Sequence, residues 1–592
     1  MIGTYAAVVA ICAASLAIGQ AAIGLCGARR WSWLAPPVGL ALVGAICWGT
    51  VRLPGDGVVS ALAVLVLTIA AVVYLRGRTE GTDEALAAGW PVALGALLAT
   101  ALPFIAEGHF GILGTSFNPD MSQHLLAADR LAEGNSSQLL VQGYPLGPHA
   151  IVVALNKGLG IGLVQGFTGL TIAVAVLASL TALAAFRDLP VIPRTAGALV
   201  VGLAYLVASY FAQGAFKETM QALYLLAFVL ALRESQHDWA GQNLRFVPAA
   251  LVAVGSVYTY SFPGLIWLTA AFVIWCLATL VSAAGGDDRE DSPGRESPRS
   301  ESGPAARALG LALLTFFVLI APELGRLIDF KQFETFDPNG PGLGNLFGQI
   351  TPFEALGLWP SGDFRLAPGD GAVPALGYYL GVAFALALFI YGLVWLWRRR
   401  ETAILSGLAA AALAYAAART VGTPYTAAKA IEIGAPLVAL AIVLPLLSAP
   451  LFLFVAVDRK GTGEVVRRVV AGGFVVAAGV CSLLALANAP VGPTSYSSTL
   501  SEYRKLVGEG PTLVLASPQL VDEEHGEPFL AWELRGGRVC IKSTGDPGVP
   551  PGVRFVVRDE GGWTLTRVGD PSPGKSPCPL IAVRQARQGP AR

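Results

Sequence analysis

Long apolar runs separated by short polar connections make up most of the first 490 residues of this chain. An apolar run of about 20 residues is long enough for a helix to cross the hydrocarbon core of a bilayer. We count about fourteen such runs, so the pattern predicts a polytopic α-helical membrane protein with about fourteen transmembrane helices. The runs are centred near residues 15, 42, 67, 96, 174, 204, 226, 253, 273, 316, 386, 410, 442 and 479.

Basic residues fall in alternate connections between these runs, as at Arg29 and Arg30 and again at 398–400. Short loops that are rich in lysine and arginine stay in the cytoplasm. The other set of connections holds few basic residues and includes the two longest loops, 106–162 and 327–373. We therefore expect both loops, the N-terminus and everything beyond about residue 490 to lie outside the cytoplasm.

Two segments break the apolar pattern in different ways. Residues 285–306 combine charges with Ser-Pro and Gly-Pro pairs and hold no large apolar side chain, which predicts a disordered cytoplasmic linker. Residues 491–592 have the polarity of a soluble domain, and their short strand-like runs and one helix-like run predict a small exoplasmic α/β domain. The chain thus divides into a transmembrane domain, 1–490, and an exoplasmic domain, 491–592.

The composition supports this class and narrows the function. Of the 592 residues, 54% are hydrophobic and 14% are charged, and the mean hydropathy of +0.60 is too high for a soluble protein. Lysine plus arginine and aspartate plus glutamate balance at 40 each. This balance argues against nucleic acid as a partner and against a strongly basic lipid-binding surface.

The seven cysteines fall into two groups. Five of them lie in apolar runs and are interpreted as small core residues. The other two, Cys540 and Cys578, lie in the polar C-terminal segment. Because an exported domain lies in a compartment that permits disulfides, we expect one bond between these two cysteines.

The first long loop contains the most distinctive polar residues of the chain. Asn118 followed by proline is a helix start with the asparagine as N-cap, and it predicts a helix over 119–132. The spacing places Asp120 and His124 on one face, while leucines on another face predict that the helix lies at the membrane interface. An acid in the first turn is also explained by the helix dipole alone.

Further polar residues lie near helix ends on the same expected side of the membrane. Ionisable side chains at membrane depth are costly and usually functional, although a lysine at a helix end can also reach the interface by snorkelling. We expect them to converge on one outward-facing cavity that binds the substrates. These candidates are His124, His149, Tyr144, Lys217, Glu218, Tyr260, Arg419, Tyr425 and Lys429.

A carboxylate beside several cations suits transfer from a phosphate-linked donor. The carboxylate takes a proton from an acceptor hydroxyl, while lysine or arginine neutralises the departing phosphate. A soluble nucleotide donor is not available outside the cytoplasm, whereas a lipid-phosphate donor is. The same loop offers metal ligands at Glu107, His109, Asp120, His124 and His149, but their spacing matches no zinc signature. We therefore expect no obligatory cofactor and leave a divalent metal open.

The residues Asn-Pro-Asp at 118–120, with Gln-His at 123–124, resemble the GT-C superfamily of integral membrane glycosyltransferases. Its members use polyprenyl-phosphate-linked sugars on the outer face of the membrane. The resemblance covers about residues 85–490 and implies Asp120 as general base, a polyprenyl-phosphate-sugar donor, and a glycan or lipid acceptor. The C-terminal domain looks like the soluble domains of some members. Three additional N-terminal helices and the lack of a second acid beside Asp120 depart from the family pattern.

The composition also indicates a source and leaves a rival function open. Abundant alanine, glycine, valine, leucine and arginine with few lysines are typical of a high-GC bacterium, so we expect a bacterial plasma membrane and cell wall biogenesis by an arabinosyltransferase or mannosyltransferase. The main alternative is a transporter or flippase of a lipid-linked glycan. A transporter needs polar residues along a continuous path, and the inner halves of these helices are apolar. A non-catalytic scaffold would leave the polar residues unexplained.

Overall fold

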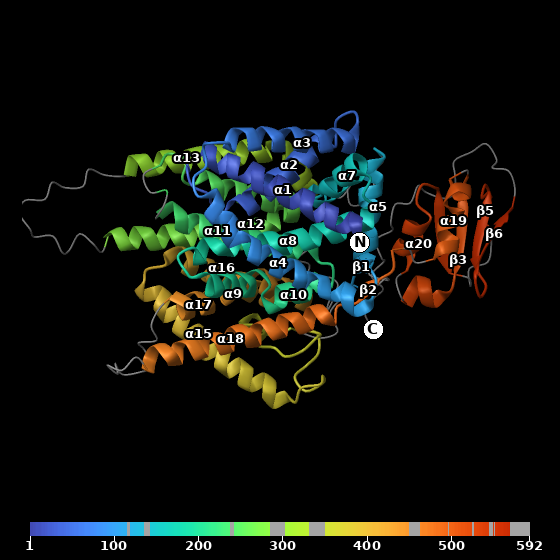
Figure 1. Cartoon of the computed structure of the whole chain (residues 1–592). Helices are drawn as coiled ribbons and strands as arrows, with labels where there is room; N and C mark the ends of the chain where they lie inside the picture. Colours follow the sequence, from blue (N-terminus) through green and yellow to red (C-terminus); the bar gives the residue numbers. More distant parts are fainter. Residues whose placement is uncertain are drawn as a thin grey trace, which may run out of the picture.

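The computed structural model consists of a helical bundle with a small α/β domain at one end of it (Figure 1). The described parts of the chain are residues 1–114, 119–134, 143–236, 239, 242–284, 302–330, 350–448, 462–494, 497–508, 510–523, 526–543, 549 and 551–568. Asn118, Cys578 and most of the expected linker 285–306 fall outside these parts.

Most of the described chain is helical. The bundle contains α1 (Ile2–Leu25), α2 (Ala35–Thr50), α3 (Asp56–Leu75), α4 (Thr82–Glu107), α8 (Leu163–Phe186), α9 (Val191–Gly202), α10 (Tyr205–Ala212), α11 (Phe216–Gln236), α12 (Val247–Ala284), α13 (Ser302–Ile320), η2 (Ala321–Glu323), α14 (Leu324–Asp329), α15 (Ala375–Arg398), α16 (Thr402–Val421), α17 (Pro424–Ser448) and α18 (Thr462–Ala487). The first long loop holds strand β1 (Ile112–Leu113) and helices α5 (Pro119–Ala132) and α7 (Gly147–Leu159), and the second holds the 3-10 helix η4 (Pro352–Leu356).

The helices have the length and composition of membrane spans. Within the described residues, 10 helices can cross a membrane, or 11 if α9 and α10, which are bent by 53° at their junction, form one span. A polytopic helical membrane protein is therefore confirmed, whereas the expected count of about fourteen is not. The counts differ because α2 has only 16 residues, α11 is polar at both ends, and α12 counts as one span.

Helix α12 reverses direction near its middle. Ser261 has φ 62° and ψ −157°, a conformation that breaks the helix next to Pro263. The ring of Phe246, just before α12, packs on Trp275 with 5.8 Å between the centroids. On a straight helix these two positions would be about 43 Å apart, so the two halves of α12 must fold back on each other. This matches the two apolar runs near 253 and 273 in the sequence.

The basic connections gather at one end of the bundle. Arg30 lies 4.0 Å from Glu80, and Arg233 at the end of α11 pairs with Glu401 before α16 at 2.8 Å. At the opposite end, β1 pairs with β2 (Val491–Gly492), which brings the ends of α4 and α18 together. Figure 1 shows α5 and α7 at this second end, beside the C-terminal domain. The arginine-rich end and the end with the long loop are therefore opposite.

The C-terminal domain is the small α/β unit that the sequence predicts. It contains α19 (Ser498–Val507), β3 (Thr512–Ala516), η5 (Gln519–Glu523), α20 (Glu527–Glu533), β4 (Val539–Ser543), β5 (Phe555–Asp559) and β6 (Trp563–Arg567). The strand order is β4-β3-β5-β6, with β3 parallel to both neighbours and β6 antiparallel to β5. Cys540 is disulfide-bonded, but Cys578 lies outside the described residues, so the pairing of these two cysteines stays a prediction.

Helix α5 lies between the bundle and the C-terminal domain. The helix packs against α7 on one side and α20 on the other, and its apolar side chains Leu125 and Leu126 are buried. Asp129 of α5 forms an ion pair with the guanidinium of Arg535 at 3.5 Å. The same guanidinium lies 3.7 Å from the ring centre of Trp532. The expectation of a helix on the membrane surface is therefore corrected, because protein covers the faces that were assigned to lipid.

Candidate functional site

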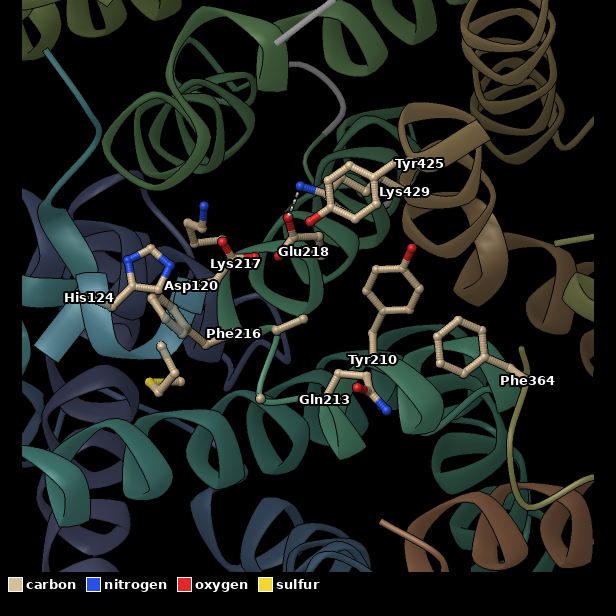
Figure 2. Close-up of a pocket in the computed structure, with 13 residues that line it drawn as sticks. Asp120, His124, Tyr210, Gln213, Phe216, Lys217, Glu218, Phe364, Tyr425 and Lys429 are labelled. Carbon is tan, nitrogen blue, oxygen red and sulfur yellow. Dashed lines mark ion pairs between the residues drawn. The ribbon is translucent and has the colours of Figure 1, made fainter. Parts of the chain in front are cut away.

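A cavity with about 610 Å³ of empty space, open solvent at its mouth included, lies where α5, α10, α11 and α17 meet. It brings together six of the residues singled out in the sequence: Asp120, His124, Lys217, Glu218, Tyr425 and Lys429. Figure 2 shows their side chains around one space, with Asp120 and His124 on one side of the Glu218–Lys429 pair. These six residues therefore share one cavity, at the end of the bundle opposite Arg30 and Arg233.

The turn between α10 and α11 directs two charges into the cavity. Gly214 has φ 71°, and a Cβ at this position would lie 2.7 Å from the carbonyl oxygen of Leu113. Only glycine avoids both the unfavourable backbone conformation and this clash. The turn ends at Phe216, so Lys217 and Glu218 occupy the first turn of α11 and line the cavity.

The central charge pair is Lys429 with Glu218. The ammonium lies 2.9 Å from Oε1 of the carboxylate, with exposed side-chain fractions of 18% and 5%. The ammonium also lies 4.2 Å from the ring centre of Tyr425, and the Tyr260 hydroxyl donates to Oε1 of Glu218 at 3.5 Å. Because its charge is shared with a buried carboxylate, Lys429 is a weaker candidate for binding an anion than an unpaired lysine would be.

Lys217 is the cation that remains available in the cavity. Its ammonium lies 4.4 Å from the ring centre of Tyr144, a cation–π contact that leaves its hydrogen-bond donors free for a ligand. Within the described part of the chain it forms no ion pair. Asp120 interacts electrostatically with it from the first turn of α5 and is exposed. An exposed carboxylate and an unpaired ammonium therefore face the same space.

Two buried histidines stand behind Asp120. Nδ1 of His124 lies 3.0 Å from Nε2 of His149, and the pair is surrounded by the rings of Phe167, Phe216 and Tyr144. Burial lowers the pKa of His149 to about 3. Burial and the nearby Lys217 and His149 hold the pKa of His124 well below its ordinary value. Both rings are therefore neutral near pH 7.

The environment of His149 determines which nitrogens carry the protons. Nδ1 of His149 is buried and has no partner among the described residues. A proton there would be an unpaired buried N–H, which is costlier than an unpaired acceptor. We therefore assign the proton of His149 to Nε2, from which it is donated to Nδ1 of His124. His124, which lines the cavity, then keeps its own proton on Nε2 and offers an N–H donor to a ligand.

The histidine pair predicts a specific acid sensitivity. Because the folded-state pKa of His149 is about 3 and the ordinary value is 6.5, the unfolded chain binds more protons between these values. The free energy of unfolding is therefore highest above pH 6.5 and decreases as the pH falls below this value. At pH 5 the decrease that is due to His149 is about 2 kcal/mol. We expect His149→Phe to flatten this dependence in thermal melts from pH 7.5 to 5. His109→Phe, at an exposed histidine, is the control, and an unchanged slope in His149→Phe would contradict the assignment.

An ion-pair network around the buried Glu323 lies beside the site, next to α12 and α14. Glu323 accepts a hydrogen bond from Arg52 at 2.8 Å and also pairs with Arg326. Arg326 in turn donates to the carbonyl oxygens of Gly143 at 3.0 Å and Val257 at 3.2 Å. These contacts fix the turn of α12 and the backbone next to Tyr144. The network explains Glu323 and Arg326 as structural residues.

The remaining candidates are distributed as follows. Tyr144 lies under Lys217, Tyr260 lies behind Glu218, and His149 lies behind His124. Arg419 is exposed near the end of α16 and is not part of the cavity lining, so its role in substrate binding stays a prediction. Among the described residues, no three His, Cys, Asp or Glu side chains are grouped to hold a metal ion.

The cavity also contains residues that the sequence did not single out. Tyr210 and Gln213 come from the end of α10, and Phe364 comes from the second long loop. The sequence does indicate the position of Tyr210 and Gln213, because Gly214 beside the charged residues Lys217 and Glu218 marks a helix break at the end of a span. No signal in the sequence marked Phe364.

No protein-family model and no curated protein matches this sequence. The solved structures similar to it include the following two. One is arabinofuranosyltransferase AftD from Mycobacteria, with a TM-score of 0.47, 15% identity, and coverage of 82% of this chain and 35% of that chain. The other is the archaeal oligosaccharyltransferase AglB from Archaeoglobus fulgidus, in complex with an inhibitory peptide and a dolichol-phosphate. Its TM-score is 0.44 at 12% identity, with coverage of 76% of this chain and 64% of that chain.

This chain therefore spans about a third of the arabinofuranosyltransferase and less than two thirds of the oligosaccharyltransferase. At these identities the similarity concerns the fold alone.

Proposed function

We propose that this chain is a membrane glycosyltransferase that transfers a sugar from a polyprenyl-phosphate donor to a glycan or lipid acceptor of the cell envelope. The observation that carries the proposal is the shared cavity of Asp120, Lys217 and the Glu218–Lys429 pair (Figure 2). It combines an exposed base with an available cation, which are the two groups that displacement of a phosphate requires.

The residues of the cavity have separate roles in the reaction. Asp120 takes the proton from an acceptor hydroxyl as its oxygen attacks the anomeric carbon of the donor sugar. The bond between that carbon and the phosphate oxygen breaks, and its electron pair leaves with the polyprenyl phosphate. Lys217 stabilises the negative charge on the leaving phosphate, and the N–H of His124 donates a hydrogen bond to one of the substrates next to Asp120. Glu218 keeps Lys429 in place at 2.9 Å.

The distribution of charge favours an extracytoplasmic site. The connections that carry Arg30 and Arg233 lie at the end of the bundle opposite the cavity, where Arg233 pairs with Glu401. Because basic connections remain in the cytoplasm, this arrangement favours a cavity on the outer face of a bacterial plasma membrane. The N-terminus and the C-terminal domain would then lie outside as well. A lipid-linked donor suits this location, because its head group reaches the outer surface while its chain stays in the bilayer.

One observation favours the alternative of a flippase for a lipid-linked glycan. Glu432 lies about one helical turn further into α17 than Lys429, is fully buried, and both of its carboxylate oxygens lack a partner among the described residues. Ionisable groups at this depth often mark a transport path. The candidate path would run from the cavity along α17.

Analysis of a deletion strain tests the proposal and separates the two functions. We expect mass spectrometry of the envelope glycans to show the loss of one type of sugar residue, and expression of the intact chain to restore it. Purified protein in liposomes, given a polyprenyl-phosphate-sugar and a glycan acceptor on the same side, should then form a glycosidic product. Movement of the lipid donor across the bilayer without product formation would contradict a transferase and support the flippase.

A further inference from the structure

The cavity has a second side with a chemistry different from that of the charged side. Tyr210 at the end of α10 packs on Phe364, with 5.6 Å between the ring centres and 38° between the ring planes. Both residues and Gln213 line the cavity. Figure 2 shows these three residues across the Glu218–Lys429 pair from Asp120 and His124. This aromatic side, defined as Tyr210, Gln213 and Phe364, takes no part in the chemistry described above.

The segment that carries Phe364 is held in place by a set of short contacts. The Tyr205 hydroxyl donates to the carbonyl oxygen of Ser361 at 3.1 Å, and the Ser361 hydroxyl donates to that of Asp363 at 2.7 Å. Arg365 donates two hydrogen bonds to the carboxylate of Asp363, at 2.8 and 2.6 Å. Phe364 lies between the residues of this pair, so its ring is preorganised against Tyr210 without a ligand.

Gln213 is the partly exposed polar residue of the aromatic side. Its side-chain amide is partly exposed and has no partner among the described residues. An amide offers both donors and an acceptor, so it pairs well with hydroxyl groups. The aromatic side therefore combines two tilted aromatic rings with two neutral hydrogen-bonding groups, the amide of Gln213 and the buried hydroxyl of Tyr210.

We propose that the aromatic side is a subsite for one sugar ring of the donor or the acceptor. One face of the ring would pack on Tyr210 and Phe364, and hydroxyls at the edge of the ring would pair with the amide of Gln213. A sugar ring has both an apolar C–H face and a polar edge. A prenyl chain would leave the amide of Gln213 without a partner, and a phosphate would find no charge on this side to offset its own. The assignment rests on the proposed function for the identity of the sugar-bearing molecules.

Glycoside binding to the purified protein in nanodiscs tests this subsite without requiring catalysis. The probes are octyl arabinofuranoside and octyl mannopyranoside, with octyl phosphate as the probe that lacks a sugar ring. We expect at least one glycoside to bind, Phe364→Leu to weaken its binding about 5- to 10-fold, and Gln213→Leu to weaken it about 5-fold. Tyr210→Phe, which keeps the ring, should bind within about 2-fold of the intact protein.

The controls separate a loss of the subsite from a loss of folding. Phe353→Leu changes a phenylalanine of the same segment that is 47% exposed, and it should leave glycoside binding unchanged. Gln213→Leu alters a partly exposed side chain, so a normal thermal melt shows that its effect is local. Transfer assays of Phe364→Leu and Gln213→Leu show which substrate uses the subsite. A higher KM for the acceptor alone places the acceptor sugar on the aromatic side, and a higher KM for the donor alone places the donor sugar there.

The proposal is overturned if neither glycoside binds, or if Phe364→Leu and Gln213→Leu bind as tightly as the intact protein. The proposal is also overturned if these variants weaken the binding of octyl phosphate as much as that of the glycosides, because the contact would then be to the alkyl chain. These results would leave the transferase function standing. Failure of the proposed function would instead appear as movement of the lipid donor across the bilayer without formation of a glycosidic product.

Discussion

Asp120→Asn is expected to lower the rate of sugar transfer about 10³-fold, within the range that a general base contributes. Asparagine keeps the size and hydrogen-bonding shape of the side chain but cannot accept the proton of the acceptor hydroxyl. The KM for the donor should change little, because Lys217 and the neutral parts of the cavity remain. Initial rates with a radiolabelled polyprenyl-phosphate-sugar measure the effect.

A loss of folding cannot account for an effect of this size. Asp120 is exposed at the start of α5, where the carboxylate contributes to stability through the helix dipole, and asparagine is also accepted at helix starts. Glu133→Gln, at an exposed acid just after the same helix, removes a charge away from the cavity and should leave the rate unchanged. If Asp120→Asn transfers sugar at the normal rate, Asp120 is not the base.

The second large effect is expected for Lys217→Met. Removal of a group that stabilises charge in the transition state typically costs about 10²- to 10³-fold in rate. We therefore expect kcat/KM for the donor to fall by that factor, with little change in the KM for the acceptor. Methionine preserves most of the packing of the lysine stem on Tyr144 while removing the charge, so the comparison isolates the ammonium group.

Lys217 is a cleaner target than Lys429. Replacing Lys429 would leave the buried carboxylate of Glu218 without its partner, which typically destabilises a protein by about 3 to 5 kcal/mol. Lys157→Met, at an exposed lysine on α7, is the matched control and should behave like the intact protein. Equal changes in donor and acceptor KM for Lys217→Met would count against a role in binding the donor phosphate.

Part of the candidate site could be predicted because it depends on local spacing. Asp120 and His124 are four positions apart in a helix whose start is encoded by Asn-Pro, so their shared face follows from helix geometry. Lys217 and Lys429 stood out because a charge at the end of an apolar run is rare and costly. These inferences used neighbouring residues only, and the structure brings all four side chains to one cavity.

The contacts that organise the site could not be predicted in the same way. The pairing of Glu218 with Lys429, and of His124 with His149, depends on which helices are neighbours in the bundle. Apolar spans are interchangeable in their patterns, so the sequence does not encode those neighbours locally. Phe364 lies in a loop without periodicity, and Arg419 has the same sequence character as Lys217 although it is exposed outside the cavity.

The sequence by itself determined that this chain is a multi-span helical membrane protein with a small α/β domain after the last span. It could do so because the length of an apolar run and the position of arginines are one-dimensional properties with direct physical consequences in a bilayer. Only the tertiary structure decided that α12 folds back at Ser261, that α5 is covered by the C-terminal domain, and that Lys429 pairs with Glu218. Each of these depends on packing between segments far apart in the chain, where shape and charge select one neighbour among many similar helices.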